Sequence, residues 1–165
     1  MISKKHVTYL ALGTNLGHRE DNLREALQKL PPGVEISAVS RLYETAPAYV
    51  LGQPAFLNIA LKGQTALSPT DLLVYLKQIE TQIGREKTIR YGPRKIDLDI
   101  IFYDGLILNT PDLVIPHPRM AERGFVLRPL ADIAADFVHP ILKQTVVELA
   151  ADLSAEDGIL RVIDW

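Results

Sequence analysis

The sequence predicts an α+β fold, and two patterns in the chain carry this prediction. Segments of alternating polar and apolar residues, rich in β-branched and aromatic side chains, indicate strands. Two further segments, in which leucine and isoleucine recur every three or four residues, indicate helices. Their order along the chain is strand, helix, strand, strand, helix, strand. This βαββαβ order is typical of a ferredoxin-like antiparallel sheet with two helices on one face, followed here by C-terminal additions.

The first half of the chain supplies the first four of these elements. Residues 7–13 form a strand that ends at a polar loop. A helix follows, with apolar residues at positions 23, 26, 27 and 30, and it stops at Pro31-Pro32-Gly33. Residues 34–45 form a second strand that loses its alternation midway, as a bulged strand does. After a loop containing proline and glycine, residues 56–65 form the third strand.

The second helix has the clearest boundaries in the sequence. Ser68 and Pro69 suit the N-cap and first-turn positions, and a stripe of leucine and isoleucine then runs as far as Gly84. The fourth strand covers residues 96–103. Asp104-Gly105 then provides a two-residue turn into an apolar stretch over residues 106–108.

The C-terminal additions are shorter elements. The sequence predicts a short helix over residues 128–134, a second helix that begins with a capping box at residues 145–148, and a final strand over residues 159–163. No repeat or linker divides the chain. We therefore expect one domain over residues 1–165.

Composition excludes several classes of function. The 165 residues contain no cysteine, which rules out disulfides, thiolate metal ligands and cysteine nucleophiles. The formal net charge of -2 argues against a nucleic-acid or anionic-membrane partner, because such surfaces need an excess of cationic side chains. The absence of an apolar leader and of a membrane-spanning apolar segment favours a cytoplasmic location. No strongly apolar stripe indicates an interface, so we expect a monomer.

Asp97 and Asp99 are the first candidates for a functional site. Two residues apart on a strand, they project from the same face with backbones about 6.6 Å apart, so both carboxylates can reach one metal ion. Carboxylate oxygen suits Mg²⁺, which is usually held by one or two carboxylates together with phosphate oxygens and water. On residue types alone, two aspartates on a solvated strand face are an equally good interpretation.

A cationic loop directly precedes this strand. Its only acid is Glu86, and its basic residues are Arg85, Lys87, Arg90, Arg94 and Lys95. Arginine forks match phosphate oxygens, and in phosphoryl transfer cations and Mg²⁺ stabilise the charge on the transferred group. A run of charge by itself usually forms a solvated loop. Its position beside the two aspartates favours binding of a polyphosphate.

Further candidates lie before and after this region. His117, between two prolines and close to Arg123, suits a phosphate contact, although a lone histidine is more often structural. Phe56 and Phe125 offer flat apolar faces, and Asn58 offers an amide suited to the edge of a heterocycle, although aromatic residues in strands usually belong to the core. The phosphate-binding P-loop, the dinucleotide-binding fingerprint and the protein-kinase catalytic loop are all absent from the sequence.

Taken together, these segments resemble the family of 6-hydroxymethyl-7,8-dihydropterin pyrophosphokinases of folate biosynthesis. The main match is the run from Arg90 to Ile101. Shorter matches lie before and after this run, in the order in which the family has them. They are Ala11-Leu12-Gly13-Thr14-Asn15-Leu16-Gly17, Tyr43-Glu44-Thr45, Phe56-Leu57-Asn58, Ile79-Glu80 through Gly84-Arg85, and Ile115-Pro116-His117-Pro118-Arg119-Met120 through Arg123-Gly124-Phe125. The resemblance covers nearly the whole chain to about Ile133. The residues after it carry no family landmark.

The resemblance implies a ferredoxin-like fold and transfer of the β,γ-pyrophosphoryl group of ATP to the pterin hydroxymethyl oxygen, with release of AMP. It also implies two Mg²⁺ ions held by Asp97 and Asp99, with Arg85 and Arg94 as catalytic clamps on the phosphates. The residues implied at the nucleotide are Lys77, Glu80, Lys87, Ile100, His117 and Arg123. Those implied at the pterin are Thr45, Pro47, Ala48, Phe56, Asn58, Tyr91 and Phe125.

Two other functions stay open at this level. A ferredoxin-like fold can also serve as a non-catalytic ligand-binding module, because fold alone does not fix function. A Mg²⁺-dependent nuclease is compatible with paired aspartates, but the sequence lacks the broad basic track that a nucleic-acid polymer requires.

Overall fold

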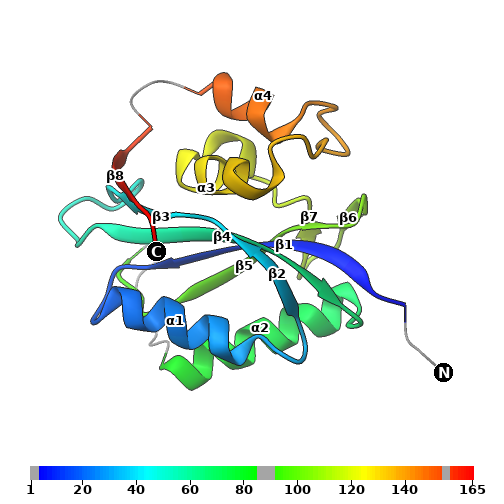
Figure 1. The fold of residues 1–165 in the computed structure, drawn as a ribbon, viewed down its shortest axis with the longest axis horizontal. Helices are drawn as coiled ribbons and strands as arrows, with labels where there is room; N and C mark the ends of the chain where they lie inside the picture. Colours follow the sequence, from blue (N-terminus) through cyan, green and yellow to red (C-terminus); the bar gives the residue numbers. More distant parts are fainter. Residues whose placement is uncertain (1–3, 85–91, 154–156) are drawn as a thin grey trace.

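The computed structural model describes residues 4–84, 92–153 and 157–165. Within these ranges, an antiparallel sheet lies between two helical layers (Figure 1). The strands are β1 (His6–Thr14), β2 (Glu35–Val39), β3 (Leu42–Thr45), β4 (Phe56–Thr65), β5 (Asp97–Tyr103), β6 (Leu108–Asn109), β7 (Val114–Ile115) and β8 (Ile159–Ile163). The helices are α1 (Arg19–Lys29), α2 (Pro69–Ile83), the 3₁₀ helix η1 (Met120–Glu122), α3 (Gly124–Ala134) and α4 (Val146–Ala151).

The strand order confirms the ferredoxin-like prediction. Neighbouring strands in the main sheet run β5-β1-β4-β3-β8, and β2 also pairs with β4. All of these pairings are antiparallel. Strands β1 and β4 form the centre of the sheet, where their pairing extends from His6 opposite Thr65 to Thr14 opposite Leu57.

Each face of the sheet has its own hydrophobic core. Helices α1 and α2 cover one face (Figure 1). Leu10 of β1 and Leu76 of α2 are fully buried there. Helices α3 and α4 cover the other face, where Phe102 of β5 packs with Leu127 and Leu130 of α3. The predicted C-terminal additions therefore form a second helical layer.

The second predicted helix has the ends that its sequence indicates. The Ser68 hydroxyl accepts a hydrogen bond from the Asp71 N–H at 3.2 Å, which satisfies one of the free donors of the first turn. At the other end, Gly84 adopts a left-handed conformation with φ of 101° and donates its N–H to the Glu80 carbonyl. The capping box of α4, from Thr145 to Glu148, is also confirmed.

Residues 34–45 form two strands and not the single bulged strand predicted. Strand β2 pairs with the end of β4 near Gln64, and β3 pairs with its beginning near Phe56. Between them, Ser40 donates its N–H to the Ala60 carbonyl, and its hydroxyl accepts the Ala60 N–H, both at 2.9 Å. Because a side chain takes the place of a backbone acceptor here, the strand is interrupted.

The apolar stretch over residues 106–108 follows the predicted turn, and the structure decides its path. The turn at Asp104-Gly105 is present, with a φ of 47° at Asp104. The chain does not run back along β5 from this turn, because β6 pairs with β7 in a separate two-stranded sheet. Leu106 and Leu108 pack against the core beneath α1 and α2, so burial of these leucines decides the path.

The C-terminal elements agree with the prediction apart from one boundary. The helix predicted over residues 128–134 begins earlier, at Gly124, a residue with low helix propensity. The final strand is confirmed as β8 and pairs with β3 at the edge of the sheet. Within the described ranges, none of the helices combines the length and the apolar character that crossing a bilayer requires.

Candidate active site

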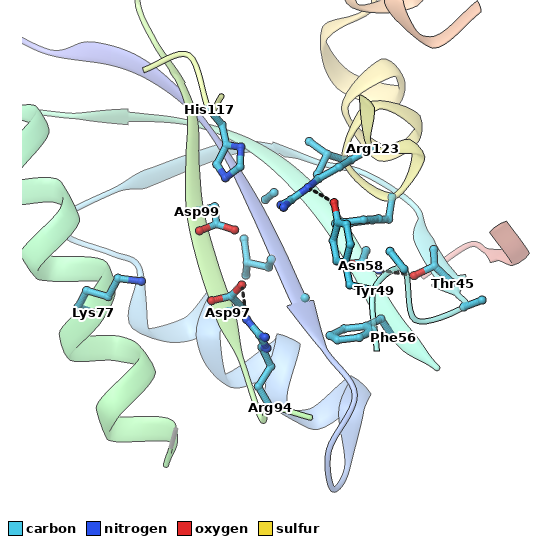
Figure 2. A pocket seen from close by; sticks show the side chains of 17 residues that line it. Thr45, Tyr49, Phe56, Asn58, Lys77, Arg94, Asp97, Asp99, His117 and Arg123 are labelled. Atoms are coloured by element: carbon cyan, nitrogen blue, oxygen red, sulfur yellow. Dashed lines mark hydrogen bonds and ion pairs between the residues drawn. The ribbon is translucent and has the colours of Figure 1, made fainter. Parts of the chain in front are cut away.

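A cavity of about 320 Å³ lies on the α3 side of the sheet, where β1 ends and where β4 and β5 begin (Figure 2). Its walls come from these strands, from α2 at Lys77, from the loops after β3 and before β5, from the segment between β7 and η1, and from the first turn of α3. The lining residues are Ala11, Leu12, Gly13, Thr45, Ala46, Ala48, Tyr49, Phe56, Asn58, Lys77, Arg94, Asp97, Asp99, His117, Arg123, Phe125 and Val126.

Most of the predicted site residues meet in this cavity, although they are far apart in the sequence. Those that line it are Thr45, Ala48, Phe56, Asn58, Lys77, Arg94, Asp97, Asp99, His117, Arg123 and Phe125. Three predicted site residues lie in the described ranges but do not line the cavity, and these are Pro47, Glu80 and Ile100. Those outside the described residues are Arg85, Lys87 and Tyr91.

Strand β5 places Asp97 and Asp99 side by side on the cavity wall, as its alternation predicts (Figure 2). The residues opposite them on β1 are small, with Gly13 facing Asp97 and Ala11 facing Asp99. Small neighbours leave room beside both carboxylates. The intervening side chain, Leu98, points to the opposite core.

The two carboxylates repel each other in this setting. Burial, followed by the nearby Asp97 charge, raises the pKa of Asp99 to about 7, although Lys77 and Arg123 act in the opposite direction and lower it. Asp99 is only partly exposed, and such an acid beside a second acid binds its proton tightly, because the ionised form is poorly solvated and faces a like charge. The site therefore favours a compensating cation. Within the described ranges, no group of three or more His, Cys, Asp or Glu side chains is arranged to hold a metal ion.

Glu80 supports the aspartate strand from behind. Its side chain is 1% exposed, and its carboxylate accepts the Leu98 N–H at 2.8 Å. A second carboxylate oxygen lies 3.2 Å from the Lys77 ammonium, which itself lines the cavity. Since Leu98 lies between Asp97 and Asp99, this buried acid fixes the backbone that carries both of them.

Ile100 lies in the core beneath α1 and α2, because successive side chains of β5 alternate between the two faces of the sheet and Asp99 faces the cavity. Its side chain points away from the site. Any contact that Ile100 makes with a ligand must come from its backbone.

Arg94 connects the loop before β5 to the first aspartate. One guanidinium nitrogen, Nη1, lies 3.2 Å from Asp97 Oδ2, and Nε donates to the Gly92 carbonyl at 3.2 Å. Its backbone is held by Asn15, whose Oδ1 accepts the Arg94 N–H at 2.9 Å and whose N–H donates to the Arg94 carbonyl at 3.1 Å. The guanidinium is therefore fixed at the cavity edge before any ligand binds.

Asn15 is a residue to which the sequence assigned no role. It is 1% exposed and its amide also donates to the Gln53 side chain and the Pro54 carbonyl. One side chain thus joins the loops that follow β1, precede β4 and precede β5. The available signal was an asparagine within a Thr-Asn-Leu-Gly turn, where a short amide can satisfy backbone groups of several loops.

His117 presents a neutral imidazole to the cavity. Its Nδ1 accepts the Arg119 N–H at 3.3 Å, which assigns the ring proton to Nε2. Burial, followed by the positive charge of Arg123, lowers the pKa of His117 to about 4. At neutral pH this side chain is an uncharged hydrogen-bond donor toward the cavity.

Replacing His117 by asparagine should change how stability depends on pH. The folded protein holds His117 neutral down to about pH 4, whereas the unfolded chain takes up a proton near pH 6.5. Wild-type stability should therefore fall by about 2–3 kcal/mol relative to His117→Asn between those two pH values. Urea unfolding of both proteins at pH 7 and pH 4.5 measures the difference, and parallel pH profiles would contradict it.

Tyr49 is the second residue to which the sequence assigned no role. Its hydroxyl accepts the Arg123 Nε–H at 2.9 Å (Figure 2), and the Arg119 guanidinium lies 4.6 Å from its ring centre. The guanidinium of Arg123 also lies 5.5 Å from the ring centre of Phe125. Cations over aromatic faces hold these groups in place. An aromatic residue in a loop rich in proline and glycine was the only sequence signal.

The opposite wall contains Asn58, Thr45 and two aromatic rings. The buried Asn58 amide donates to the Thr45 hydroxyl at 2.7 Å, which fixes its orientation. The Asn58 side chain also lies close to Gly13 of β1. Only glycine leaves room there, because a Cβ at position 13 would lie 2.7 Å from the Asn58 oxygen. Phe56 and Phe125 come from β4 and α3 and line the same cavity. This wall suits a flat, polar-edged ring.

Comparison with known proteins shows the family. The model of the family "7,8-dihydro-6-hydroxymethylpterin-pyrophosphokinase (HPPK)" matches residues 9–135. The protein "Folic acid synthesis protein FOL1" of Dictyostelium discoideum is 47% identical over 148 residues, which are 90% of this chain and 22% of that protein. The "2-amino-4-hydroxy-6-hydroxymethyldihydropteridine pyrophosphokinase" of Bacillus subtilis is 45% identical over 130 residues, which are 78% of each chain.

Solved structures share the fold. The crystal structure of Plasmodium falciparum HPPK-DHPS with pteroate has a TM-score of 0.76 at 18% identity, over 92% of this chain and 43% of that one. The chain spans between 18% and 25% of the length of the first three curated relatives that it matches, those from Dictyostelium discoideum, Pneumocystis carinii and Arabidopsis thaliana. With a family match over residues 9–135, the chain belongs to the 7,8-dihydro-6-hydroxymethylpterin pyrophosphokinase family.

Proposed function

We propose that this protein transfers the pyrophosphoryl group of ATP to the hydroxymethyl oxygen of 6-hydroxymethyl-7,8-dihydropterin in folate biosynthesis. The products are the pterin diphosphate and AMP. The observation that carries the proposal is one cavity in which a pair of carboxylates and several cations face a wall of aromatic and amide groups. The carboxylates and cations suit a metal-bound polyphosphate, and the wall suits a pterin.

Asp97 and Asp99 are the proposed ligands of Mg²⁺, with two ions expected. The donor set fits, because Mg²⁺ prefers carboxylate oxygens and completes its shell with phosphate oxygens and water. The raised pKa of Asp99 indicates a site that gains from a bound cation. When bound, Mg²⁺ neutralises phosphate charge and lowers the pKa of a nearby hydroxyl group.

The cationic side chains are the proposed contacts of the triphosphate. Arg94 is held at the edge of the cavity and offers a guanidinium fork, while Lys77 and Arg123 line the cavity as further positive charges. His117 offers an Nε2–H donor that stays uncharged at neutral pH. Glu80 supports Asp97 and Asp99 through Leu98. Arg85 and Lys87 stay predictions, because they lie outside the described residues.

The wall formed by Thr45, Phe56, Asn58 and Phe125 is the proposed pterin site. The oriented Asn58 amide and the backbone of residues 45–48 provide polar groups for the ring edge. The two phenylalanine rings provide apolar faces for the ring itself. Tyr91 stays a prediction for the same reason as Arg85.

The reaction then depends on positioning more than on acid–base chemistry. The pterin hydroxymethyl oxygen forms a bond to the β-phosphorus of ATP. At the same time the bond between this phosphorus and the oxygen that bridges the α- and β-phosphorus atoms breaks, and AMP leaves with that oxygen. The hydroxyl proton passes to solvent. This chain's fixed cations stabilise the charge that spreads over the transferring group, and its rigid walls hold the two reactants in line.

Calorimetric titration with a non-hydrolysable ATP analogue and 6-hydroxymethylpterin tests the proposal. We expect nucleotide binding to require Mg²⁺ and to strengthen pterin binding. In a separate assay with ATP and the dihydropterin, we expect turnover to yield one AMP for each pterin diphosphate. Release of ADP would point to transfer of a single phosphate. Failure to bind either ligand would favour a binding module, and cleavage of an oligonucleotide would favour a nuclease. Neither alternative is supported by the family match. The monomeric state and the cytoplasmic location stay predictions.

A further inference from the structure

The segment of residues 157–159 contacts two walls of the cavity, although it lies beyond residues 9–135 that match the family. It follows α4 in the chain and leads into β8 at the edge of the sheet (Figure 1). Asp157 contacts the first turns of α3 on one side. Gly158 and Ile159 contact the end of β3 on the other.

The contact with α3 is a tight ion pair. Arg128 Nε donates to Asp157 Oδ2 at 2.7 Å, and the side chains are 34% and 11% exposed, respectively. The bond is short because both partners are charged. Asp157 also packs on the backbone of Gly124, where an added Cβ would lie 2.7 Å from the Asp157 Cβ. Gly124 lies between Arg123 and Phe125, which both line the cavity.

The contact with β3 runs through backbone hydrogen bonds. Ile159 pairs with Thr45, and the Ala46 N–H donates to the Gly158 carbonyl at 2.9 Å. The second Asp157 oxygen, Oδ1, accepts the Ile159 N–H at 3.2 Å. The Asp157 carboxylate therefore binds α3 with one oxygen and the start of β8 with the other, and β8 pairs with β3 at Thr45.

We propose that Asp157 is a positioning residue that sets the spacing between Phe125 and the Thr45-Ala46 wall, and through it the affinity for the pterin. The inference rests on the proposed function, since it concerns the same cavity. Asp157 does not touch the cavity itself. Its effect comes from holding the two walls at a fixed separation before the ligand binds, which reduces the ordering that binding requires. The nucleotide residues on β5 and α2 do not depend on this contact. Arg123, which precedes Gly124, is held separately by the Tyr49 hydroxyl at 2.9 Å.

The variant Asp157→Asn tests the proposal, because it keeps the shape of the side chain and removes its charge. We expect the pterin Kd to rise about tenfold, the nucleotide Kd to change by less than about twofold, and the pterin KM to rise more than kcat falls. Asp132→Asn is the matched control. Asp132 also joins α3 to β3, through Arg41 Nη2 at 3.0 Å and the Tyr43 hydroxyl at 2.8 Å, but none of these three residues lines the cavity. It should lower the Tm without changing the pterin Kd.

Amide hydrogen exchange in the unliganded protein gives a second, independent readout. Asp157→Asn should speed exchange at Ala46, whose N–H bonds to Gly158, and leave exchange at Ser40 unchanged. A folded Asp157→Asn protein with wild-type pterin Kd and wild-type Ala46 exchange would overturn the proposal. Should that variant not fold, Arg128→Lys carries the same two expectations. Wild-type protein that binds no pterin would overturn the proposed function, and the exchange rates would still decide whether Asp157 holds the walls.

Discussion

Replacing Asp99 by asparagine should reduce turnover by a factor of about 100 or more and leave the protein at least as stable as the wild type. The loss follows from removing a proposed Mg²⁺ ligand, which costs about 3 kcal/mol or more of transition-state stabilisation. The stability follows from the partly desolvated position beside Asp97, because the amide carries no charge to desolvate and none to repel. A residue that destabilises the fold and supports the reaction is typical of active sites.

The stability gain should depend on pH in a defined direction. The unfolded chain ionises Asp99 near pH 4, whereas the folded protein keeps the carboxyl proton up to about pH 7. The wild type therefore loses stability relative to Asp99→Asn as the pH rises between these values, and the difference levels off above them. Thermal or urea unfolding without Mg²⁺ measures this effect, and AMP release at saturating substrate measures turnover.

Two comparisons make this result specific. Asp136→Asn removes an equal charge from an exposed position outside the cavity and should leave turnover unchanged. Asp97→Asn should lose turnover in the same way but should gain less stability than Asp99→Asn, because it removes the pair with Arg94 at 3.2 Å together with the repulsion from Asp99. Near-normal turnover in either Asp97→Asn or Asp99→Asn would show that the metal assignment is wrong.

Replacing Arg94 by alanine should lower kcat by a factor of about 100 and weaken nucleotide binding by less than about fivefold. Asn15 fixes the Arg94 backbone, and the Gly92 carbonyl accepts a hydrogen bond from the guanidinium Nε. Under the proposed function, this places the guanidinium where charge develops during transfer. A contact that strengthens mainly in the transition state changes kcat more than affinity. Single-turnover kinetics and calorimetry with the ATP analogue separate the two quantities.

The variant Arg94→Lys refines this test. Lysine keeps the charge but has no planar fork, so it cannot contact Asp97 and a phosphate with the same geometry. We expect it to recover only a small part of the lost kcat. Arg24→Ala, on an exposed face of α1, is the control for loss of a positive charge. An equal loss in kcat and affinity for Arg94→Ala would make Arg94 a holder of ATP and not a contributor to the chemical step.

Local signals predicted much of the fold and part of the site. The capping of α2 from Ser68 to Gly84 follows from side chains that satisfy helix ends within a few residues, so the sequence pattern suffices. The common orientation of Asp97 and Asp99 follows from the two-residue period of a strand. Both predictions depend on geometry that neighbouring residues alone determine.

Other features depend on contacts between distant segments. The split of residues 34–45 results from the Ser40 hydroxyl replacing a backbone acceptor for Ala60, and the path of residues 106–108 results from burial of two leucines. The supporting role of Glu80 requires α2 to lie behind β5. No periodicity in the sequence encodes these contacts, because the two residues of each contact become neighbours only when the chain folds.

The sequence by itself determined the ferredoxin-like order of elements, the position of the carboxylate pair and the absence of cysteine chemistry. Only the tertiary structure decided which side chains meet at the cavity, that Asn15 and Tyr49 hold its arginines, and that Asp157 joins two of its walls. The physical reason is the distance along the chain over which each effect acts. Backbone propensity and side-chain alternation act over a few residues, whereas burial, pKa shifts and ion pairs depend on segments that only folding brings together.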